Sequence, residues 1–166
     1  MSEHGTEEGV IKFDLAFDHQ PLVDIDISQL RAWRNILKQL GLLGQDPDRY
    51  GGFGFGNISA RSAGGFVISG SQTGNLPDCG LEGYAEVTAW SLPDNRIVAR
   101  GAVKPSSESL THAAVYDVSP EARFVYHVHS PAIWRRASHL GIPVTDAGVA
   151  YGTPAMAQQV GRLACP

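Results

Sequence analysis

The chain has 166 residues, of which 43% are hydrophobic and 18% charged, with a formal net charge of −4 and a pI near 5.8. This length suits a single domain with a substantial core, and the acidic balance argues against nucleic acid as a partner, because nucleic-acid binding needs a basic face. No apolar run approaches the ~20 residues that cross a bilayer, so no membrane partner is expected. The two cysteines, Cys79 and Cys165, lack a disulfide-framework spacing, which indicates a reducing, cytoplasmic compartment.

The first part of the chain contains one predicted helix. Residues 1–9 are acidic and polar and are expected to form a disordered tail, not a signal peptide. Residues 10–24 fit no regular pattern. Ser28 is the expected N-cap of a helix that ends at Gly41. Its apolar residues recur at helical spacing and are Leu30, Trp33, Leu37 and Leu40. Three basic residues are expected on the opposite, solvent-facing side: Arg31, Arg34 and Lys38.

A glycine-rich run follows, from residue 51 to residue 57. It does not match the dinucleotide-binding fingerprint, because Asn57 stands where the third glycine should be and the next residues are typical of a strand. Extended segments separated by turn residues then predict an antiparallel sheet, with Pro93-Asp94-Asn95 as a hairpin turn. The predicted strands are residues 57–61, 65–69, 84–92 and 96–101.

Two segments carry clustered hydroxyl groups. The loop from Ser69 to Gly74 can bind an anion through its backbone N–H groups, although most Gly/Ser turns bind nothing. Ser106 and Ser107 begin a helix that runs to about Val118, and they offer a phosphate cradle or simply cap the helix. The sequence alone leaves both alternatives open.

The same helix start carries two titratable residues. Glu108 in the first turn favours the helix dipole, and its carboxylate is also a candidate general acid/base. His112 lies four residues later on the same face, where it either orients the site or packs in the core.

The next strand, from about Phe124, carries a His-x-His pair. Side chains alternate along a strand, so His127 and His129 share one face, while Tyr126 and Val128 point the other way. Two such imidazoles can reach one zinc ion, although histidines in this pattern often only hydrogen-bond to the backbone. After this strand, residues 132–139 are predicted to form a helix with His139 on its surface, and a last helix begins near Pro154.

Four motifs occur in a characteristic order: Gly56-Asn57-Ile58-Ser59, Ile68-Ser69 with Thr73-Gly74, Pro105-Ser106-Ser107-Glu108 with His112, and His127-Val128-His129. In this order they resemble the class II aldolase/adducin family, from about Leu30 to Leu163. The resemblance implies an α/β (α+β-like) domain over residues 10–166, with a central, mainly antiparallel β-sheet flanked by helices. It also implies a cytoplasmic homotetramer with active sites at subunit interfaces.

The resemblance also implies roles for individual residues. His127 and His129 would be zinc ligands, and Glu108 would be the catalytic acid/base. Six residues would hold a substrate phosphate: Gly56, Asn57, Thr73, Gly74, Ser106 and Ser107. The implied function is a zinc-dependent lyase of carbohydrate metabolism, acting on a small sugar phosphate or hydroxy-carbonyl compound, in which zinc stabilises an enediolate and Glu108 moves the proton.

Two departures from the family pattern leave alternatives open. The family's third histidine ligand lies beyond Pro166, so the domain is expected to lack its C-terminal part. A tyrosine proton donor of the phosphate aldolases is replaced near Ala147, so an epimerase, a dehydratase or a non-catalytic adducin-like module remains an alternative. A Schiff-base mechanism would need a buried lysine, and by sequence position only Lys104 is near these motifs.

Overall fold

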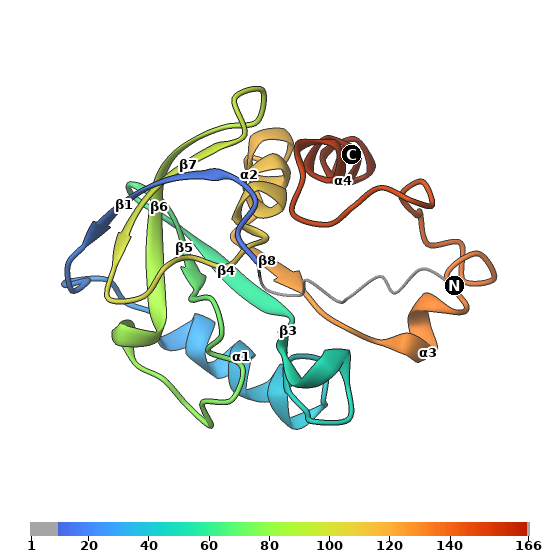
Figure 1. Cartoon of the computed structure of the whole chain (residues 1–166), viewed down its shortest axis with the longest axis horizontal. Coiled ribbons are helices and arrows are strands. Elements are labelled where there is room, and N and C mark those ends of the chain that lie inside the picture. The colour runs from blue at the N-terminus through green and yellow to red at the C-terminus, as the bar shows by residue number, and fades with distance from the viewer. Residues whose placement is uncertain (1–9, 166) are drawn as a thin grey trace.

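The described part of the chain, residues 10–165 of a computed structural model, is organised around one six-stranded sheet. The tail expected over residues 1–9 lies outside the described residues. The strands are β1 (Asp14–His19), β4 (Asn57–Ser62), β5 (Gly65–Ser69), β6 (Tyr84–Ser91), β7 (Arg96–Gly101) and β8 (Phe124–His127). They lie in the order β1-β7-β6-β5-β4-β8, and all neighbours are antiparallel except β1 and β7, which are parallel (Figure 1). The mainly antiparallel sheet is therefore confirmed.

Local sequence patterns located four of these strands correctly. β4, β5, β6 and β7 match the predicted ranges to within one residue, because turn residues bound each extended segment. β1 was not predicted. It is an edge strand whose only strand partner is β7, some eighty residues away in sequence, with Asp14 opposite Arg96 and His19 opposite Gly101.

Four helices accompany the sheet: α1 (Ser28–Gln39), α2 (Ser109–Val118), α3 (Pro131–Trp134) and α4 (Pro154–Ala164). The helix predicted over residues 132–139 is reduced to the single turn of α3, followed by turns. α4 begins as expected, with Pro154 in its first turn and the Thr153 hydroxyl accepting the Met156 N–H at 3.3 Å.

Each face of the sheet has its own core, and β5 shows why. Phe66 and Ile68 belong to one cluster with residues of α2 and α4, whereas Val67 between them belongs to the other cluster with α1. Figure 1 accordingly shows α2 and α4 on one side of the sheet and α1 on the other. The fold is a three-layer arrangement of helix, sheet and helix.

The buried face of α1 differs from the prediction. Leu30 and Leu37 are buried as expected, but Trp33 and Leu40 are 43% and 66% exposed, and Arg34 is only 1% exposed. Positions 30, 34 and 37 are spaced by four and three residues, so they form one stripe along the helix. Arg34 thus points into the protein, where the sequence analysis placed it on the solvent side.

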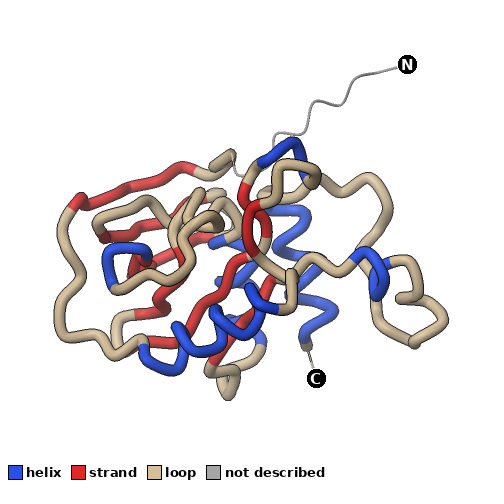
Figure 2. The backbone as a smooth tube through the Cα atoms, turned by 90° about the horizontal axis from the view of Figure 1, so that it is seen from below, coloured by secondary structure: helices blue, strands red, loops and turns tan. Residues whose placement is uncertain are grey.

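The rest of the described chain consists of short elements and loops. A two-stranded sheet pairs β2 (Gly44–Gln45) with β3 (Gly54–Phe55), around the 3₁₀ turn Tyr50–Gly52, and a second 3₁₀ turn spans Leu81–Gly83. Figure 2 shows the segment around α3 as a loop-rich arm that leaves the body of the sheet before the chain returns in α4. No helix within residues 10–165 is long and apolar enough to cross a bilayer.

Candidate active site

Strand pairing brings the first two candidate residues together. β4 and β8 run antiparallel, and Asn57 lies directly opposite His127 in their register. The Asn57 Nδ2 and His127 Nδ1 atoms are 3.1 Å apart, so the amide holds the orientation of the imidazole. A second-layer partner of this kind commonly fixes which ring nitrogen is free to bind a metal ion.

His129 lies beyond the end of β8 and is held by different contacts. Its backbone N–H donates to the Leu42 carbonyl at 2.8 Å, and its ring packs edge-on against Tyr50, with 4.6 Å between centroids. The His127 and His129 ring centroids are only 4.8 Å apart. Burial lowers the pKa of each histidine to about 4, so both imidazoles are neutral near pH 7. Neutral imidazole is the form that binds metal ions.

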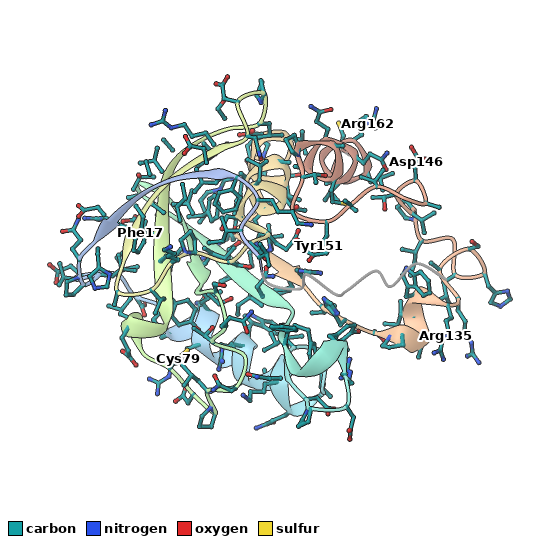
Figure 3. The ribbon with its side chains drawn as sticks, viewed as in Figure 1. Phe17, Cys79, Arg135, Asp146, Tyr151 and Arg162 are labelled. Atoms are coloured by element: carbon teal, nitrogen blue, oxygen red, sulfur yellow. The ribbon has the colours of Figure 1, made fainter. Side chains whose placement is uncertain are left out.

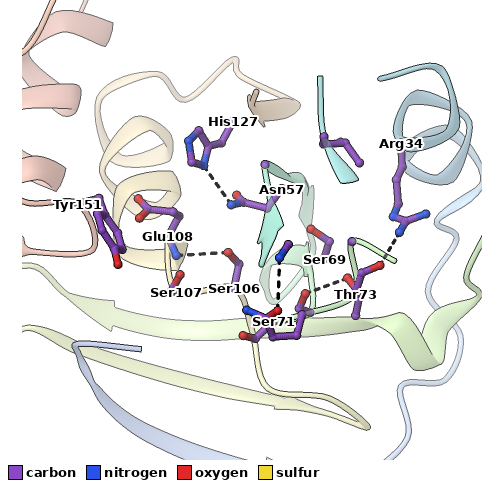
Figure 4. Close-up of a pocket in the computed structure, with 16 residues that line it drawn as sticks. Arg34, Asn57, Ser69, Ser71, Thr73, Ser106, Ser107, Glu108, His127 and Tyr151 are labelled. Carbon is purple, nitrogen blue, oxygen red and sulfur yellow. Dashed lines mark hydrogen bonds between the residues drawn. The ribbon is translucent and has the colours of Figure 1, made fainter. Parts of the chain in front are cut away.

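The two hydroxyl-bearing segments also meet in space. Gly70 and Pro105 form an isolated antiparallel bridge, and the Ser71 N–H donates to the Lys104 carbonyl at 2.9 Å. A pocket lies where these segments approach the ends of β4 and β8 (Figure 4). Eight of the nine predicted site residues line it: Gly56, Asn57, Thr73, Gly74, Ser106, Ser107, Glu108 and His127. His129 lines an adjoining cavity instead, and His127 borders both.

The pocket hydroxyls differ in what they can still donate. Thr73 Oγ1 donates to the Gly70 carbonyl at 2.9 Å, so an anion would meet this residue through its backbone. Ser106 Oγ accepts the Glu108 N–H at 3.3 Å and keeps its own hydroxyl proton available for a ligand. Ser69 Oγ likewise only accepts, from the Ile58 N–H at 3.2 Å. Ser69 was not among the predicted site residues.

Glu108 is the acidic residue of the pocket and is 7% exposed. Burial raises the pKa of its carboxyl, while the Thr111 hydroxyl, the Lys12 charge and the Gly152 N–H act in the opposite direction. The Thr111 hydroxyl donates to Oε2 at 2.9 Å and so orients the carboxylate. A buried carboxyl with a raised pKa binds a proton more readily than an exposed one, which suits a general acid/base.

His112 belongs to the core and not to the pocket. Its side chain is 1% exposed, and its Nδ1 lies 2.7 Å from Ser59 Oγ, which in turn contacts the Tyr116 hydroxyl at 2.8 Å. Burial lowers the pKa of His112 to about 3, so the ring is neutral. Of the two readings of the sequence, the structure supports packing.

Three basic residues near the pocket were missed. Lys12 lies 4.0 Å over the Tyr151 ring and close enough to Glu108 to affect its pKa, and Lys38 donates to the Gly74 carbonyl at 2.7 Å. The expectation that only Lys104 lies near the site is therefore wrong. Arg34 also lines the pocket. Tyr151, which Figure 3 shows pointing from the loop before α4 toward the centre of the molecule, had no local sequence signal.

Gly74 packs where no side chain fits. A Cβ there would lie 2.3 Å from the Gly44 carbonyl oxygen and 2.8 Å from its carbon, both backbone atoms. Gly56 is similar, since it has φ of 71° and its Cβ would meet Leu43 Cβ at 2.6 Å. Both glycines therefore let the β2–β3 region approach the pocket closely, whatever ligand binds there.

The substitution Gly74→Ala is expected to destabilise the fold by about 2–3 kcal/mol, because the added methyl group forces the Gly44 backbone to move. For a protein of this size, that corresponds to a melting temperature lower by roughly 5–10 °C. Thermal and urea unfolding measure the change. Gly54→Ala is the matched control, because its Cβ would have no neighbour closer than 3.7 Å. Equal melting temperatures for the two variants would show that the close approach is not rigid.

The histidine pair fits zinc in donor type and protonation but is not a complete site. Zinc takes four ligands, three of them from the protein at catalytic centres. Within residues 10–165, no group of three His, Cys, Asp or Glu side chains is arranged to hold a metal ion. The described residues thus offer two candidate ligands, and His139 is exposed and does not complete the set.

Comparison with known proteins identifies the family. Residues 48–161 match the family model described as Class II Aldolase and Adducin N-terminal domain, and the chain therefore belongs to this family. The resemblance noted in the sequence is confirmed, as is the fold class.

Individual relatives are similar over shorter stretches. A methylthioribulose-1-phosphate dehydratase from Gluconacetobacter diazotrophicus is 36% identical over 105 residues, which cover 60% of this chain and 47% of the relative. A second protein of that name, from Pseudoalteromonas translucida, is 37% identical over 79 residues, covering 46% of this chain and 34% of the relative. The crystal structure of L-fuculose-1-phosphate aldolase from Thermus thermophilus aligns with a TM-score of 0.47 at 25% identity, over 66% of this chain and 47% of that one. The chain thus spans less than half the length of these proteins.

Proposed function

We propose that this chain is part of a metal-dependent lyase that forms an enediolate from a small phosphorylated ketose or a related hydroxy-carbonyl compound. The observation that carries the proposal is the meeting, in one pocket, of a buried carboxyl group, a neutral histidine and several hydroxyl donors. These are the groups that such chemistry needs for proton transfer, metal binding and phosphate binding.

The protein residues divide the task between them. The hydroxyl groups of Ser106 and Ser107 donate hydrogen bonds to the substrate phosphate, together with the N–H groups of Thr73 and Gly74. Glu108 Oε atoms accept the proton of a substrate hydroxyl or of the carbon next to the carbonyl, and return it to the product. Burial of Glu108 keeps water away from this proton.

His127 and His129 would hold the zinc ion, oriented by Asn57 and Tyr50 respectively. When bound, zinc would supply Lewis-acid polarisation of the substrate oxygens. The proposal requires at least one further ligand from outside residues 10–165. It includes the assignment of residues 10–166 to one class II aldolase/adducin-like catalytic domain.

The proposal extends to assembly and location. A homotetramer is supported by the exposed apolar side chains of the arm around α3, which are Ile133, Trp134, Leu140, Ile142 and Val144. Figure 3 shows Arg135 and Asp146 on this arm, away from the sheet. A cytoplasmic location is supported by the free thiols of Cys79 and Cys165, since Cys79 is buried without a disulfide partner.

A dehydratase is the second candidate reaction, favoured by the 36% identity to a protein of that name. Cleavage of a carbon–carbon bond in a retro-aldol step leaves an enediolate, whereas dehydration loses water from an enediolate formed by removal of the proton next to the carbonyl. The pocket residues serve either reaction. The products distinguish them, because a retro-aldol step gives two carbonyl fragments whereas dehydration gives one product that is lighter by one water.

The test combines elemental analysis of the purified chain with an assay of phosphorylated ketoses, including methylthioribulose 1-phosphate and fuculose 1-phosphate. We expect about one zinc ion per subunit and conversion of at least one ketose phosphate, followed by ¹H NMR of the products. A chain with neither bound metal nor turnover would instead support the adducin-like alternative, a non-catalytic binding module.

A further inference from the structure

Helix α1 places a buried, positively charged side chain behind the pocket. Arg34 is 1% exposed, and its Nη2 donates to the carbonyl oxygens of Thr73 at 2.7 Å and Leu76 at 3.1 Å. Its Nη1 is buried and has no hydrogen-bond partner among the described residues. Figure 4 shows the guanidinium reaching toward Thr73 at the edge of the pocket. A buried cation is costly to the fold unless a negative charge compensates it.

Within residues 10–165, Arg34 forms no ion pair with a carboxylate. The ion pairs among residues 10–165 are Arg31 with Asp78, Arg96 with Asp14, and Arg100 with Glu86. Lys38, one turn further along the same helix, adds a second positive charge behind the same loop, donating to the Gly74 carbonyl at 2.7 Å and to Leu76 at 2.6 Å. Burial, and secondly the charge of Arg34, lower the pKa of Lys38. Two like charges therefore lie behind one short loop. Neutral side chains can donate to the same carbonyl oxygens, so these hydrogen bonds alone do not explain why both donors are charged.

These contacts also fix the direction of the N–H group on the other side of the Thr73-Gly74 peptide. A trans peptide plane carries its C=O and the following N–H on opposite sides, and the described chain has no cis peptide bond. Because the Thr73 carbonyl faces Arg34, the Gly74 N–H points away from the guanidinium. Within residues 10–165, this N–H donates to no acceptor. The cation polarises the peptide and so strengthens the donor on its far side.

The pocket itself supplies mostly neutral donors. Serine hydroxyls and backbone N–H groups dominate its lining, and Arg34 is the lining residue that carries a permanent positive charge. The acidic side chain among the lining residues is that of Glu108, at the start of α2. An anion bound to the hydroxyls would therefore find its main positive counterpart in Arg34.

We propose that Arg34 is the countercharge of a phosphate dianion bound between the Ser69–Gly74 loop and Ser106-Ser107, acting from behind the Thr73-Gly74 peptide. It is a positioning residue, since it acts through this peptide and orients its N–H group. The identification of the anion as the phosphate of the substrate rests on the proposed function, but the binding of phosphate by the pocket does not depend on catalysis. Lys38 supports the same loop from the solvent side.

The test is titration of the metal-free chain with inorganic phosphate by isothermal calorimetry, so that phosphate cannot bind through zinc. Arg34→Gln keeps an N–H donor for the loop but removes the charge, and we expect phosphate to bind at least ~10-fold more weakly to it. Arg34→Lys restores the charge and is expected to recover part of the affinity. Arg31→Gln is the matched control, because Arg31 lies on the same helix but pairs with exposed Asp78; it should bind phosphate normally.

A charge-selectivity measurement separates an electrostatic role from a structural one. Methanesulfonate has a similar shape but one negative charge, so Arg34→Gln is expected to lose more affinity for phosphate than for methanesulfonate. Equal losses for both anions, or no loss for either in a folded Arg34→Gln variant, would overturn the proposal. Should Arg34→Gln not fold, the comparison of Arg34→Lys with the wild-type chain carries the test, because a lysine cannot reproduce the planar guanidinium contact to Thr73 and Leu76 and is expected to weaken phosphate binding about 3-fold. A loss of ~10-fold or more in a folded Arg34→Lys variant would count against the proposal, because it would show that the guanidinium contact and not the charge determines phosphate affinity.

The two proposals fail in different ways. A wild-type chain that does not bind phosphate at millimolar concentration would overturn the countercharge proposal, while turnover of an unphosphorylated ketose could still support the lyase. Phosphate binding that depends on Arg34, in a chain without turnover on any ketose, would support the countercharge and overturn the lyase.

Discussion

Replacing Glu108 with glutamine is expected to reduce turnover by about 10²–10⁴-fold, the usual contribution of a positioned general acid/base. Glutamine has nearly the same shape and still accepts the Thr111 hydroxyl, but it cannot take up a proton. Because the Glu108 carboxyl is buried with a raised pKa, the substitution removes a group poised for proton transfer and no exposed charge. Steady-state rates with the best ketose phosphate from the panel measure the effect.

Metal content and phosphate affinity serve as internal checks on this variant. Both should remain close to wild type, because within residues 10–165 the Glu108 carboxylate hydrogen-bonds to Thr111, and the contact with Ser106 is made by the Glu108 backbone N–H, which the substitution keeps. Glu121→Gln is a suitable control, since Glu121 is an exposed carboxylate just after the same helix. Retention of more than about a tenth of the activity by Glu108→Gln would exclude the acid/base role.

The substitution His129→Ala is expected to reduce zinc affinity by at least ~100-fold and to leave a folded chain. The ring is one of two candidate zinc ligands among residues 10–165, so its loss would leave a single imidazole. The fold should survive, because His129 lies outside β8 and its backbone N–H bond to Leu42 is unaffected. Elemental analysis after dialysis against a weak chelator gives the metal content, and circular dichroism reports the fold.

His139→Ala is the matched control for this substitution, because His139 is exposed on the arm and should not affect metal content. Two results would contradict the ligand assignment. One is full zinc stoichiometry in His129→Ala. The other is unfolding of His129→Ala, which would indicate that the ring serves mainly to pack against Tyr50 and Phe55.

Much of this architecture was available from the sequence. The strands from β4 to β7 were predictable because extended segments bounded by turn residues are local signals that need no tertiary contact. The pair His127 and His129 was assigned to one face by strand periodicity alone, and the rings indeed lie 4.8 Å apart. The order of the four motifs indicated the family, which the match over residues 48–161 confirms.

Other features depended on contacts between distant residues. β1 forms because its backbone pairs with β7. A six-residue segment carries too weak a pattern to predict that pairing by itself. Asn57 meets His127 only through the register of β4 and β8, and the Ser69–Gly74 loop meets Ser106 only through the bridge at Pro105. These contacts, which no spacing in the sequence reveals, assemble the pocket.

Arg34 shows most clearly how the tertiary structure differs from what the sequence pattern predicts. The sequence pattern placed it on the side of the helix opposite Leu30 and Leu37, because a charged residue is normally expected to turn toward water. The tertiary structure decided otherwise, because the carbonyl oxygens of Thr73 and Leu76 accept its hydrogen bonds inside the protein. The sequence by itself therefore determined strands β4 to β7, the family and the candidate chemical groups of the site. Only the fold, through contacts between distant segments, determined which of those groups face one another and which charge lies behind them.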